Sequence, residues 1–452
     1  MTKVLLIGND IVGPRMAGPG IRYWEMRQAL ARRFEATLAI PPFLADKIAL
    51  PAPLPWLRLC HTSAELRREV EHADVIITLG IVPWLYPFIP EAGKPLVIDL
   101  YDPFLLEELQ RQPSSDEAAS LTYERYLEAL WSQLRAGDFF ICAGEKQRDY
   151  WLGMLSAVGR LNPRTYRDDP SFYRLIDIVP FGIPSSPPQH RRRVLKGVHP
   201  AIAAEDRLLL WGGGLWDWFV PLTLIRAMPL VLASRSDIKL FFMGIRRPNH
   251  PERPSPTVSQ ALELAQSLGL KDRYILFNDW VPYEARQDYL MEADLGVSLH
   301  LDRIESRFAF RTRLLDYLWA GLPILATEGD VLGEQLAAQG MAHLVAPGDM
   351  EGVAQAILHL LQEPLSPQAR EARIREAAQH YRWDKVIEPL ADFCAAPRFA
   401  ADKGYLPSVA ATGRRGGWQQ RLRKGWRLVR KGGVRAILKE AREYLQWRRS
   451  QK

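Results

Sequence analysis

The chain has 452 residues, of which 47% are apolar, so it is long and apolar enough for two globular domains and is not a disordered protein. Its net charge of +7 is unevenly distributed, because residues 414–452 contain fourteen Lys and Arg against two acidic residues, which leaves residues 1–413 at −5. An acidic body argues against nucleic acid as a partner, and three scattered cysteines exclude a disulfide or zinc framework and favour a reducing, cytoplasmic compartment.

Short apolar runs alternate with amphipathic, helix-length segments along the first half of the chain. Strands are predicted at residues 3–9, 36–40, 74–79, 95–100, 138–143 and 176–181. Helices are predicted at residues 21–34, 116–134 and 145–155. This alternation is typical of a parallel sheet covered by helices on both faces. The longest uncharged apolar run, residues 75–90, contains three prolines and is too short to span a membrane.

Residues 183–193 interrupt the pattern with turn-forming residues and a basic cluster, and they are predicted to link two domains. A second block follows, with strands predicted at residues 207–211, 239–243, 274–277, 295–299, 323–326 and 343–345. Its helices are predicted at residues 221–232, 257–268, 311–320 and 350–361. We therefore expect an α/β protein of two doubly wound, Rossmann-like domains that face a cleft, at 1–183 and 184–395, followed by a linker and tail at 396–452.

A glycine-rich turn, GPGIRY at residues 18–23, leads from the first predicted strand into the first predicted helix. Pro14 stands where a phosphate P-loop has its lysine, and Tyr23 stands where a dinucleotide fingerprint has its third glycine, so both kinds of site are disfavoured. Gly20 and Arg22 are predicted to bind an anionic donor, because a helix start offers free N–H groups and arginine offers a forked donor. The alternative is a turn with a conformational role only.

A similar turn, WGGGLWD at residues 211–217, ends the first strand of the second block. Glycines let the backbone approach a phosphate or sugar closely, so Gly213 and Gly214 are predicted to bind the donor, unless they serve plain turn geometry. Asp217 is predicted to accept a hydrogen bond from a sugar hydroxyl. The alternative is an acidic residue that stabilises a helix N-terminus.

The segment ESRFAFRTRLLD at residues 305–316 carries several charges within an apolar stretch. On a helix that begins near Phe310, Arg311, Arg313 and Asp316 fall on neighbouring turns. Arginine forks bind phosphates and a carboxylate accepts paired ribose hydroxyls, so these residue types predict a nucleotide site. The alternative is a surface helix with internal ion pairs, which the apolar continuation WAGLP disfavours.

Further motifs surround this segment: NDWVP at 278–282, MEADLGV at 291–297 and AGLPILAT at 320–327. Their order resembles the donor-site region of retaining GT-B glycosyltransferases of the family-4-like group, and the resemblance covers roughly residues 1–395. It implies a nucleotide-diphospho-sugar donor whose ribose is held by the second acid of the family's pair, here Asp316. Phe308 stands where the first acid belongs, so Glu305 is expected to replace it by a shifted loop.

The resemblance also implies how the donor diphosphate and the base are held. The family's Lys-Gly pair after the second glycine turn is absent here, so the charge on the diphosphate is expected to be met by arginines, at positions 246, 247, 311 and 313. The base is expected against the loops that follow Gly244 and surround Val281, with Phe310 also on the donor side. Arg246 is the expected phosphate ligand of the first of these loops.

Asp102 follows a predicted strand end in the first half, where such enzymes place a polar residue facing the transferred sugar. With Glu305 and Arg311 it completes the expected catalytic set, although an Asp-Pro turn is the alternative interpretation of Asp102. Nine histidines lack paired ligand spacing and no Asp-x-Asp occurs, so transfer without a metal ion and without a cofactor is expected, the sugar nucleotide being a co-substrate.

Residues 414–449 predict a basic amphipathic segment, because tryptophans and aliphatic residues recur every three or four positions among lysines and arginines. Such a segment is typical of proteins that lie on anionic membranes, with RNA or a protein groove as alternatives. We therefore expect a peripheral protein at the inner face of the cell membrane.

The first hypothesis is a retaining glycosyltransferase that moves a sugar to a hydroxyl of a cell-surface polysaccharide or a lipid-linked glycan. The alternatives are an epimerase-like enzyme of the same fold that acts on nucleotide sugars, and a degenerate transferase that serves as a membrane-bound scaffold.

Overall fold

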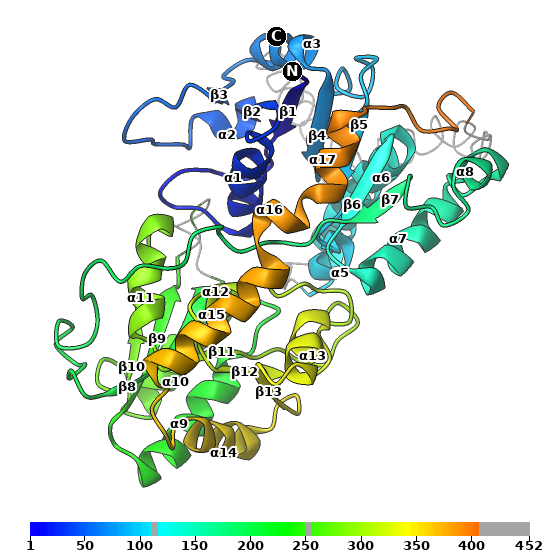
Figure 1. Ribbon diagram of the computed structural model, residues 1–452. Helices are drawn as coiled ribbons and strands as arrows, with labels where there is room; N and C mark the ends of the chain where they lie inside the picture. The colour runs from blue at the N-terminus through cyan, green and yellow to red at the C-terminus, as the bar shows by residue number, and fades with distance from the viewer. Residues whose placement is uncertain (111–115, 247, 249–254, 406–452) are drawn as a thin grey trace, which may run out of the picture.

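Two separate parallel sheets organise the protein (Figure 1). The computed structural model describes residues 1–110, 116–246, 248 and 255–405. The first sheet has seven strands in the order β3-β2-β1-β4-β5-β6-β7, and the second has six in the order β10-β9-β8-β11-β12-β13. Neighbouring strands within each sheet run parallel. The predicted class of two doubly wound α/β domains is confirmed, while the predicted tail lies outside the described residues.

The first sheet is formed by the chain up to residue 178. Its strands are β1 (Lys3–Ile7), β2 (Glu35–Ile40), β3 (Leu57–Leu59), β4 (Val75–Leu79), β5 (Leu96–Asp99), β6 (Phe139–Cys142) and β7 (Ile176–Ile178). The helices between and after them are α1 (Gly18–Leu30), α2 (Pro42–Ala45), α3 (Ser63–His72), α4 (Val82–Leu85), α5 (Phe104–Glu108), α6 (Asp116–Ala136), α7 (Glu145–Ala157) and α8 (Pro163–Asp168).

The second sheet follows residue 206. Its strands are β8 (Arg207–Gly214), β9 (Ile238–Gly244), β10 (Ile275–Phe277), β11 (Leu295–Ser298), β12 (Ile324–Thr327) and β13 (Ala342–Val345). Its helices are α9 (Pro221–Ser234), α10 (Pro256–Ser267), the short 3₁₀ helix η1 (Tyr283–Ala285), α11 (Arg286–Glu292), α12 (Arg313–Trp319), α13 (Val331–Ala338) and α14 (Met350–Leu360).

Both faces of each sheet are buried, which explains why the strands are apolar throughout. In β1, Val4 and Leu6 belong to one buried cluster while Leu5 and Ile7 belong to another, as expected for side chains that alternate across a strand. All twelve strands predicted from the sequence form, with ends that differ by no more than three residues. The strand β3 was missed because its three residues give too short an apolar run.

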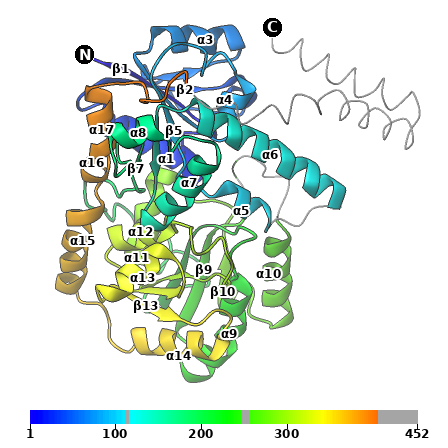
Figure 2. The ribbon, with the colours of Figure 1, turned by 90° about the vertical axis from the view of Figure 1, so that its right-hand side faces the viewer.

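Three helices at the end of the described chain run along one side of the molecule and return to the first domain (Figures 1 and 2). They are α15 (Pro367–Tyr381), α16 (Trp383–Val386) and α17 (Glu388–Ala395). α15 contacts α12 and α16 contacts α1, so the chain crosses between the domains at residue 382. On α17 the ring of Phe393 stacks on Phe139 at 4.7 Å between centroids. The return ties the two domains together from the side.

Direct contacts also join the two domains. The Gln147 side chain donates from Nε2 to the Tyr101 carbonyl in the first domain and to the Phe308 carbonyl in the second, at 2.8 and 2.7 Å. Lys146 pairs with Glu334 at 3.1 Å, and the Tyr283 N–H donates to the Pro14 carbonyl at 2.8 Å. These contacts bring the loops after the strands of the two sheets against each other. Within the described ranges, no helix is long and apolar enough to cross a membrane.

Candidate active site

The glycine turn at the end of β8 forms the centre of the candidate site. Gly213 has a φ of +67°, the left-handed region that favours glycine, and a Cβ built there would meet no atom within 4 Å. The backbone at Gly213 is therefore open to a ligand. Gly214 is more crowded, since an added Cβ would lie 3.1 Å from the Trp216 ring. The turn lies at the carboxyl end of β8, and ligands of such parallel sheets bind beyond the carboxyl ends of the strands.

Tyr317, which the sequence analysis did not select, fixes α12 against this turn. Its hydroxyl accepts the Gly212 N–H at 2.7 Å and lies 2.8 Å from the Val297 carbonyl. The ring fits only because Gly296 has no side chain, since a Cβ there would come within 2.4 Å of the ring. The sequence shows only that Tyr317 follows Asp316 and that a glycine, Gly296, interrupts an apolar predicted strand. The contact between the two is visible only in the structure. Tyr317 thus positions the charged residues of α12.

Arg313 opens α12 and is buried beside the glycine turn. Its Nη2 donates to the Gly214 carbonyl at 2.8 Å, and its guanidinium lies 3.7 Å from the centroid of the Phe219 ring and 4.8 Å from that of Trp211. Among the described residues, Nη1 has no hydrogen-bond partner and no carboxylate lies within ion-pair distance. Burial lowers the pKa of Arg313 to about 10, and the charge of Arg311 acts in the same direction. Within the described part of the chain, Arg313 is thus a buried cation without a counter-ion.

Arg311 is also buried, but it has a carboxylate partner. Its Nη2 donates to Glu305 Oε2 at 2.8 Å and to Ser306 Oγ at 3.2 Å. The Gln110 side chain of the first domain donates to the same Glu305 oxygen at 3.0 Å. Glu305 Oε1 and Arg311 Nε remain buried without a hydrogen-bond partner in the part of the chain that the structure describes. The loop thus brings the predicted pair of Glu305 and Arg311 together at the boundary between the domains.

Asp102 lies close to this pair, together with a second acid that the sequence analysis missed. Asp102 and Glu107 share a hydrogen bond between their side chains. Burial raises the pKa of Asp102 to about 6, and the negative charge of Glu305 contributes to the rise. Burial and the charge of Asp102 raise the pKa of Glu107 well above its ordinary value, so Glu107 holds the proton of that hydrogen bond. A second acid in α5, five residues after the Asp-Pro step, was the available signal.

Other buried polar atoms surround the same edge of the second sheet. Trp211 Nε1 and Ser298 Oγ have no hydrogen-bond partner among the residues described. The same is true of both ring nitrogens of His300, although the Glu328 backbone is near enough to affect its titration. Burial lowers the pKa of His300 to about 3, and Arg311 and Arg313 act in the same direction. His300 is therefore a neutral ring, and this group of unsatisfied atoms fits a polar ligand.

Asp316 lies one turn further along α12 and is partly exposed. Its Oδ1 accepts a hydrogen bond from Arg286 Nε at 3.1 Å. The Arg286 guanidinium stacks on Tyr283 at 3.7 Å and on Trp319 at 4.7 Å from the ring centroids. A hydrogen bond thus holds the Asp316 carboxylate in one orientation, on the side where the nucleotide of the donor is predicted to bind. Arg286, which donates this hydrogen bond, is a positioning residue that the sequence analysis did not select.

The remaining predicted donor residues lie along the outer edge of the turn. Asp217 accepts a hydrogen bond from Thr257 at 3.0 Å. Gly244 lets the Trp280 ring pack against the backbone of β9, since a Cβ on Gly244 would lie 2.6 Å from that ring. The Val281 N–H donates to the Met243 carbonyl at 3.1 Å. The glycines at 213 and 244 are adjacent, so this loop borders the glycine turn directly.

Arg246 and Phe310 occupy different surroundings. Arg246 is exposed and pairs with Asp279 at 3.1 Å, so its charge is already met by an acid on the surface. Phe310 is half-buried and precedes the buried Arg311, outside α12, which begins three residues later than Phe310. Position 247, named as a further phosphate ligand, lies outside the described residues.

The glycine turn of the first domain is tightly packed. Gly20 lies within α1, where an added Cβ would come within 2.2 Å of the Ile11 carbonyl oxygen, so glycine is required there by packing. Arg22 is fully buried, and it donates to both carboxylate oxygens of Asp99 at 2.6 and 2.9 Å and to the Val179 carbonyl at 2.8 Å. Although burial opposes its charge, the Asp99 carboxylate holds the pKa of Arg22 above the ordinary value.

These positions correct the prediction that Arg22 meets an anionic donor. Its charge is neutralised by Asp99 inside the first domain, so the arginine is part of the core. The described residues also contain no group of three or more His, Cys, Asp or Glu side chains placed to hold a metal ion.

Known proteins resemble this chain in sequence and in fold. Residues 206–363 match the family model described as Glycosyl transferases group 1. The chitobiosyldiphosphodolichol beta-mannosyltransferase of Debaryomyces hansenii is 26% identical over 136 residues, which are 29% of this chain. The chain covers 28% of the length of that relative.

Solved structures resemble the protein over most of its length. The sucrose-phosphate synthase of Thermosynechococcus elongatus gives a TM-score of 0.57 at 16% identity and covers 87% of this chain and 98% of its own. WaaG, a glycosyltransferase involved in lipopolysaccharide biosynthesis, gives a TM-score of 0.57 at 16% identity, and the alignment covers 87% of this chain and the whole of WaaG. Anabaena HepE, solved with UDP-glucose, gives 0.56 at 17% identity over 87% of this chain and all of its own.

At these identities the structures establish the fold. The protein has the GT-B fold of two facing Rossmann-like domains, and its residues 206–363 match the family model of Glycosyl transferases group 1.

Proposed function

We propose that this protein is a glycosyltransferase that moves a sugar from a nucleotide-diphospho-sugar to a hydroxyl group of a cell-surface glycan or of its lipid-linked precursor. The observation that carries the proposal is the buried guanidinium of Arg313, which has no counter-ion within the described structure. Keeping an unpaired charge away from water costs several kcal/mol, on the order of the penalty for a buried ion. A bound anion would remove much of that cost.

The surroundings of Arg313 indicate which anion fits. Arg311 lies near the same Phe219 ring, at 5.1 Å from its centroid, so two cations face one region. The left-handed Gly213 leaves room for a phosphate against the backbone. A diphosphate carries enough negative charge and acceptor oxygens for this set of donors. The nucleotide end of the ligand then extends toward Asp316, which accepts the ribose hydroxyls, and toward the loop at Val281, which borders the base.

The proposed reaction needs no protein nucleophile. The bond between the anomeric carbon and the diphosphate oxygen breaks, the acceptor oxygen bonds to that carbon, and the acceptor proton passes to the departing diphosphate. This course retains the anomeric configuration. Arg311 and Arg313 stabilise the charge that develops on the diphosphate, a form of catalysis that works best away from water. Asp102 and Glu305 are proposed to face the transferred sugar, and no metal ion or further cofactor takes part.

Known relatives support the donor and acceptor classes. HepE is described in complex with UDP-glucose, the matched mannosyltransferase carries a lipid-linked glycan in its name, and WaaG is involved in lipopolysaccharide biosynthesis. A membrane-bound acceptor also agrees with the basic amphipathic segment at 414–449, which lies outside the described residues. We therefore place the protein at the inner face of the cell membrane.

The test is calorimetric titration with UDP, GDP and ADP, followed by product analysis with the matching sugar nucleotides, with and without acceptor. One nucleotide should bind, and Arg313→Met should reduce sugar transfer by about 10²-fold, the effect of losing one charge-stabilising donor. Arg226→Met is the matched control, because Arg226 is exposed on α9 in the same domain. Unchanged transfer in Arg311→Ala and Asp316→Ala would reject the site assignment. Product formed without acceptor by isomerisation of the donor would instead indicate the epimerase-like alternative.

A further inference from the structure

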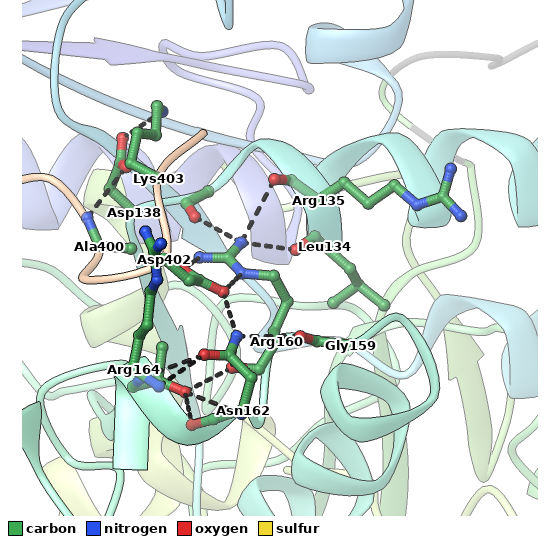
Figure 3. A network of polar contacts seen from close by, with 12 residues as sticks. Leu134, Arg135, Asp138, Gly159, Arg160, Asn162, Arg164, Ala400, Asp402 and Lys403 are labelled. Atoms are coloured by element: carbon green, nitrogen blue, oxygen red, sulfur yellow. Dashed lines mark hydrogen bonds and ion pairs between the residues drawn. The ribbon is translucent and has the colours of Figure 1, made fainter. Parts of the chain in front are cut away.

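The segment 396–405, which we call the strap, is fixed on the first domain by buried polar contacts (Figure 3). Asp402 is buried and accepts two hydrogen bonds from Arg160, at 2.8 and 3.0 Å, and one from Asn162 at 2.9 Å. Lys403 pairs with the buried Asp138 at 2.9 Å, and the Ala400 N–H donates to the same carboxylate at 3.1 Å. The last described residues are thus held on the face formed by α8 and the end of α6.

These contacts fix the last described residues of the chain firmly. Removing one partner of a buried pair such as Arg160 and Asp402 costs about 3–5 kcal/mol, so the strap does not detach readily. Arg414, the first residue of the basic segment, follows Lys403 by eleven positions, which span at most about 40 Å.

The same face exposes aromatic side chains. The exposed fractions of Tyr166 on α8 and of Phe399 and Tyr405 on the strap are 58, 47 and 47%. The three residues are connected: Phe399 lines a small cavity together with Phe172, whose ring lies 6.0 Å from that of Tyr166. Tyr405 lies under the Arg164 guanidinium, 3.8 Å from the ring centroid. Large aromatic side chains exposed together mark an interaction surface more often than scattered ones do.

Basic residues are interleaved with these rings. They are Arg164, Arg167, Arg174, Arg398 and Lys403, against the acids Asp168 and Asp169. Asp168 is paired with Arg174 at 2.9 Å and Lys403 with Asp138, whereas Asp169 accepts hydrogen bonds from the neutral Ser171 and keeps its negative charge. The surface is therefore aromatic and net positive, and it continues into a tail that carries fourteen further basic residues.

We propose that α8 and the strap form a docking surface for an anionic lipid bilayer, which acts together with the basic tail and orients the first domain on the membrane. Tyrosine and phenylalanine favour the headgroup region, and arginines attract anionic lipids. A protein partner would require a larger buried area than three exposed rings provide. The proposal goes beyond sugar transfer and does not depend on it, since it is measured by lipid binding alone.

The first test is sedimentation of the full-length protein with vesicles of phosphatidylcholine containing phosphatidylglycerol, and with vesicles of phosphatidylcholine alone. Tyr166→Ser/Phe399→Ser/Tyr405→Ser should weaken binding to the anionic vesicles at least about tenfold. Arg164→Glu should weaken it about fivefold or more, the effect of one basic residue at a charged surface. The matched controls are Leu230→Ser/Leu268→Ser and Arg226→Glu, which change exposed residues of the second domain. Equal binding by the patch variants and their controls overturns the proposal.

A second test reports which face meets the lipid. All three native cysteines are buried, so a cysteine introduced at an exposed position is labelled selectively. An environment-sensitive dye on Phe399→Cys should shift to shorter wavelength with anionic vesicles, while the same dye on Leu230→Cys should not. Equal shifts at both positions, or none at Phe399→Cys while the protein sediments with vesicles, would show that the tail binds without this surface and would overturn the proposal.

Discussion

Each domain buries one arginine near its glycine turn, but the two arginines have opposite surroundings. Arg22 in the first domain donates to both oxygens of Asp99 and to a carbonyl, although its Nη1, like that of Arg313, has no partner among the residues described. Arg313 in the second domain has one carbonyl and two aromatic rings, and its Nη1 has no partner among the residues described. Burial is equal to within a few per cent, since the exposed fractions are 0% and 7%.

The comparison shows that neither residue type nor burial identifies a binding residue. What distinguishes the two is whether the protein itself supplies the counter-charge. A buried arginine paired with a carboxylate is part of the core, whereas one without a counter-ion is stabilised only when a ligand arrives. The same difference applies to the glycines, because Gly20 is required by packing and Gly213 faces open space.

The largest expected effect is that of Arg22→Met on stability. The free energy of unfolding of the first domain should fall by about 3–5 kcal/mol, because Asp99 would be left buried without its counter-ion. Thermal unfolding measures this as a lower Tm, and the double variant Arg22→Met/Asp99→Leu, which removes both charges, should recover most of the loss. A single variant as stable as the natural protein would contradict the structural role of Arg22.

The next largest effect is a difference in stability between alanine substitutions in the two glycine turns. Gly20→Ala should destabilise the protein by about 1–3 kcal/mol, because a Cβ 2.2 Å from the Ile11 carbonyl oxygen forces the backbone to move. Gly213→Ala should cost about 1 kcal/mol, since only its positive φ opposes a side chain. Urea midpoints compare the two. Gly213→Ala should in addition weaken nucleotide binding, and equal effects of both variants on stability and binding would remove the distinction between the turns.

Arg313→Met should have the opposite sign to Arg22→Met. Without ligand, the variant should be more stable by about 1 kcal/mol, because an apolar side chain of similar length replaces an uncompensated buried charge. The nucleotide that stabilises the natural protein should give the variant no increase in Tm. Loss of stability comparable to that of Arg22→Met would mean that Arg313 is satisfied within the protein, and would contradict its assignment to the site.

The last expected effect concerns the pH dependence of stability at Asp102, the buried acid near Glu305 and Arg311. Burial raises the pKa of Asp102 to about 6, so its contribution to stability is full below the ordinary pKa and is lost as the pH rises through about 6. Asp102→Asn should therefore be as stable as the natural protein below about pH 4 and more stable by about 1–2 kcal/mol near pH 8. Unfolding followed across this pH range tests the sign. A gain that is greatest in acid would contradict the raised pKa.

Several features of the fold were predictable from local sequence. The strands are continuous apolar runs because both faces of each sheet are covered, and that pattern is visible without coordinates. Some short elements were not predicted. One is β3, which has only three residues, and another is α3, although its capping box at Thr62 and Glu65 is a signal that the sequence shows. α12 begins at Arg313, two residues after the predicted start of the helix, because Arg311 turns back to Glu305 in the loop before it.

The candidate site was predictable in its residue types and less so in its pairings. The charged segment at 305–316 marked the donor region, and Arg311 and Glu305 do meet there. Asp99 lies three positions before the predicted site residue Asp102. It was not recognised as the partner of Arg22, because Arg22 and Asp99 are 77 positions apart along the chain. Gln110 and Glu107 were missed because their significance depends on contacts across or beside the domain boundary.

The sequence by itself determined the two doubly wound domains, the separation of an acidic body from a basic tail, and the residue types available for binding phosphate. These follow from periodicity and composition, which local chain chemistry expresses directly. Only the tertiary structure decided which arginine has a counter-ion and which lacks one, and that the strap is fixed on the first domain. The physical reason is that electrostatic compensation depends on distance in space, and residues that neutralise each other here, such as Arg160 and Asp402, lie 242 positions apart along the chain.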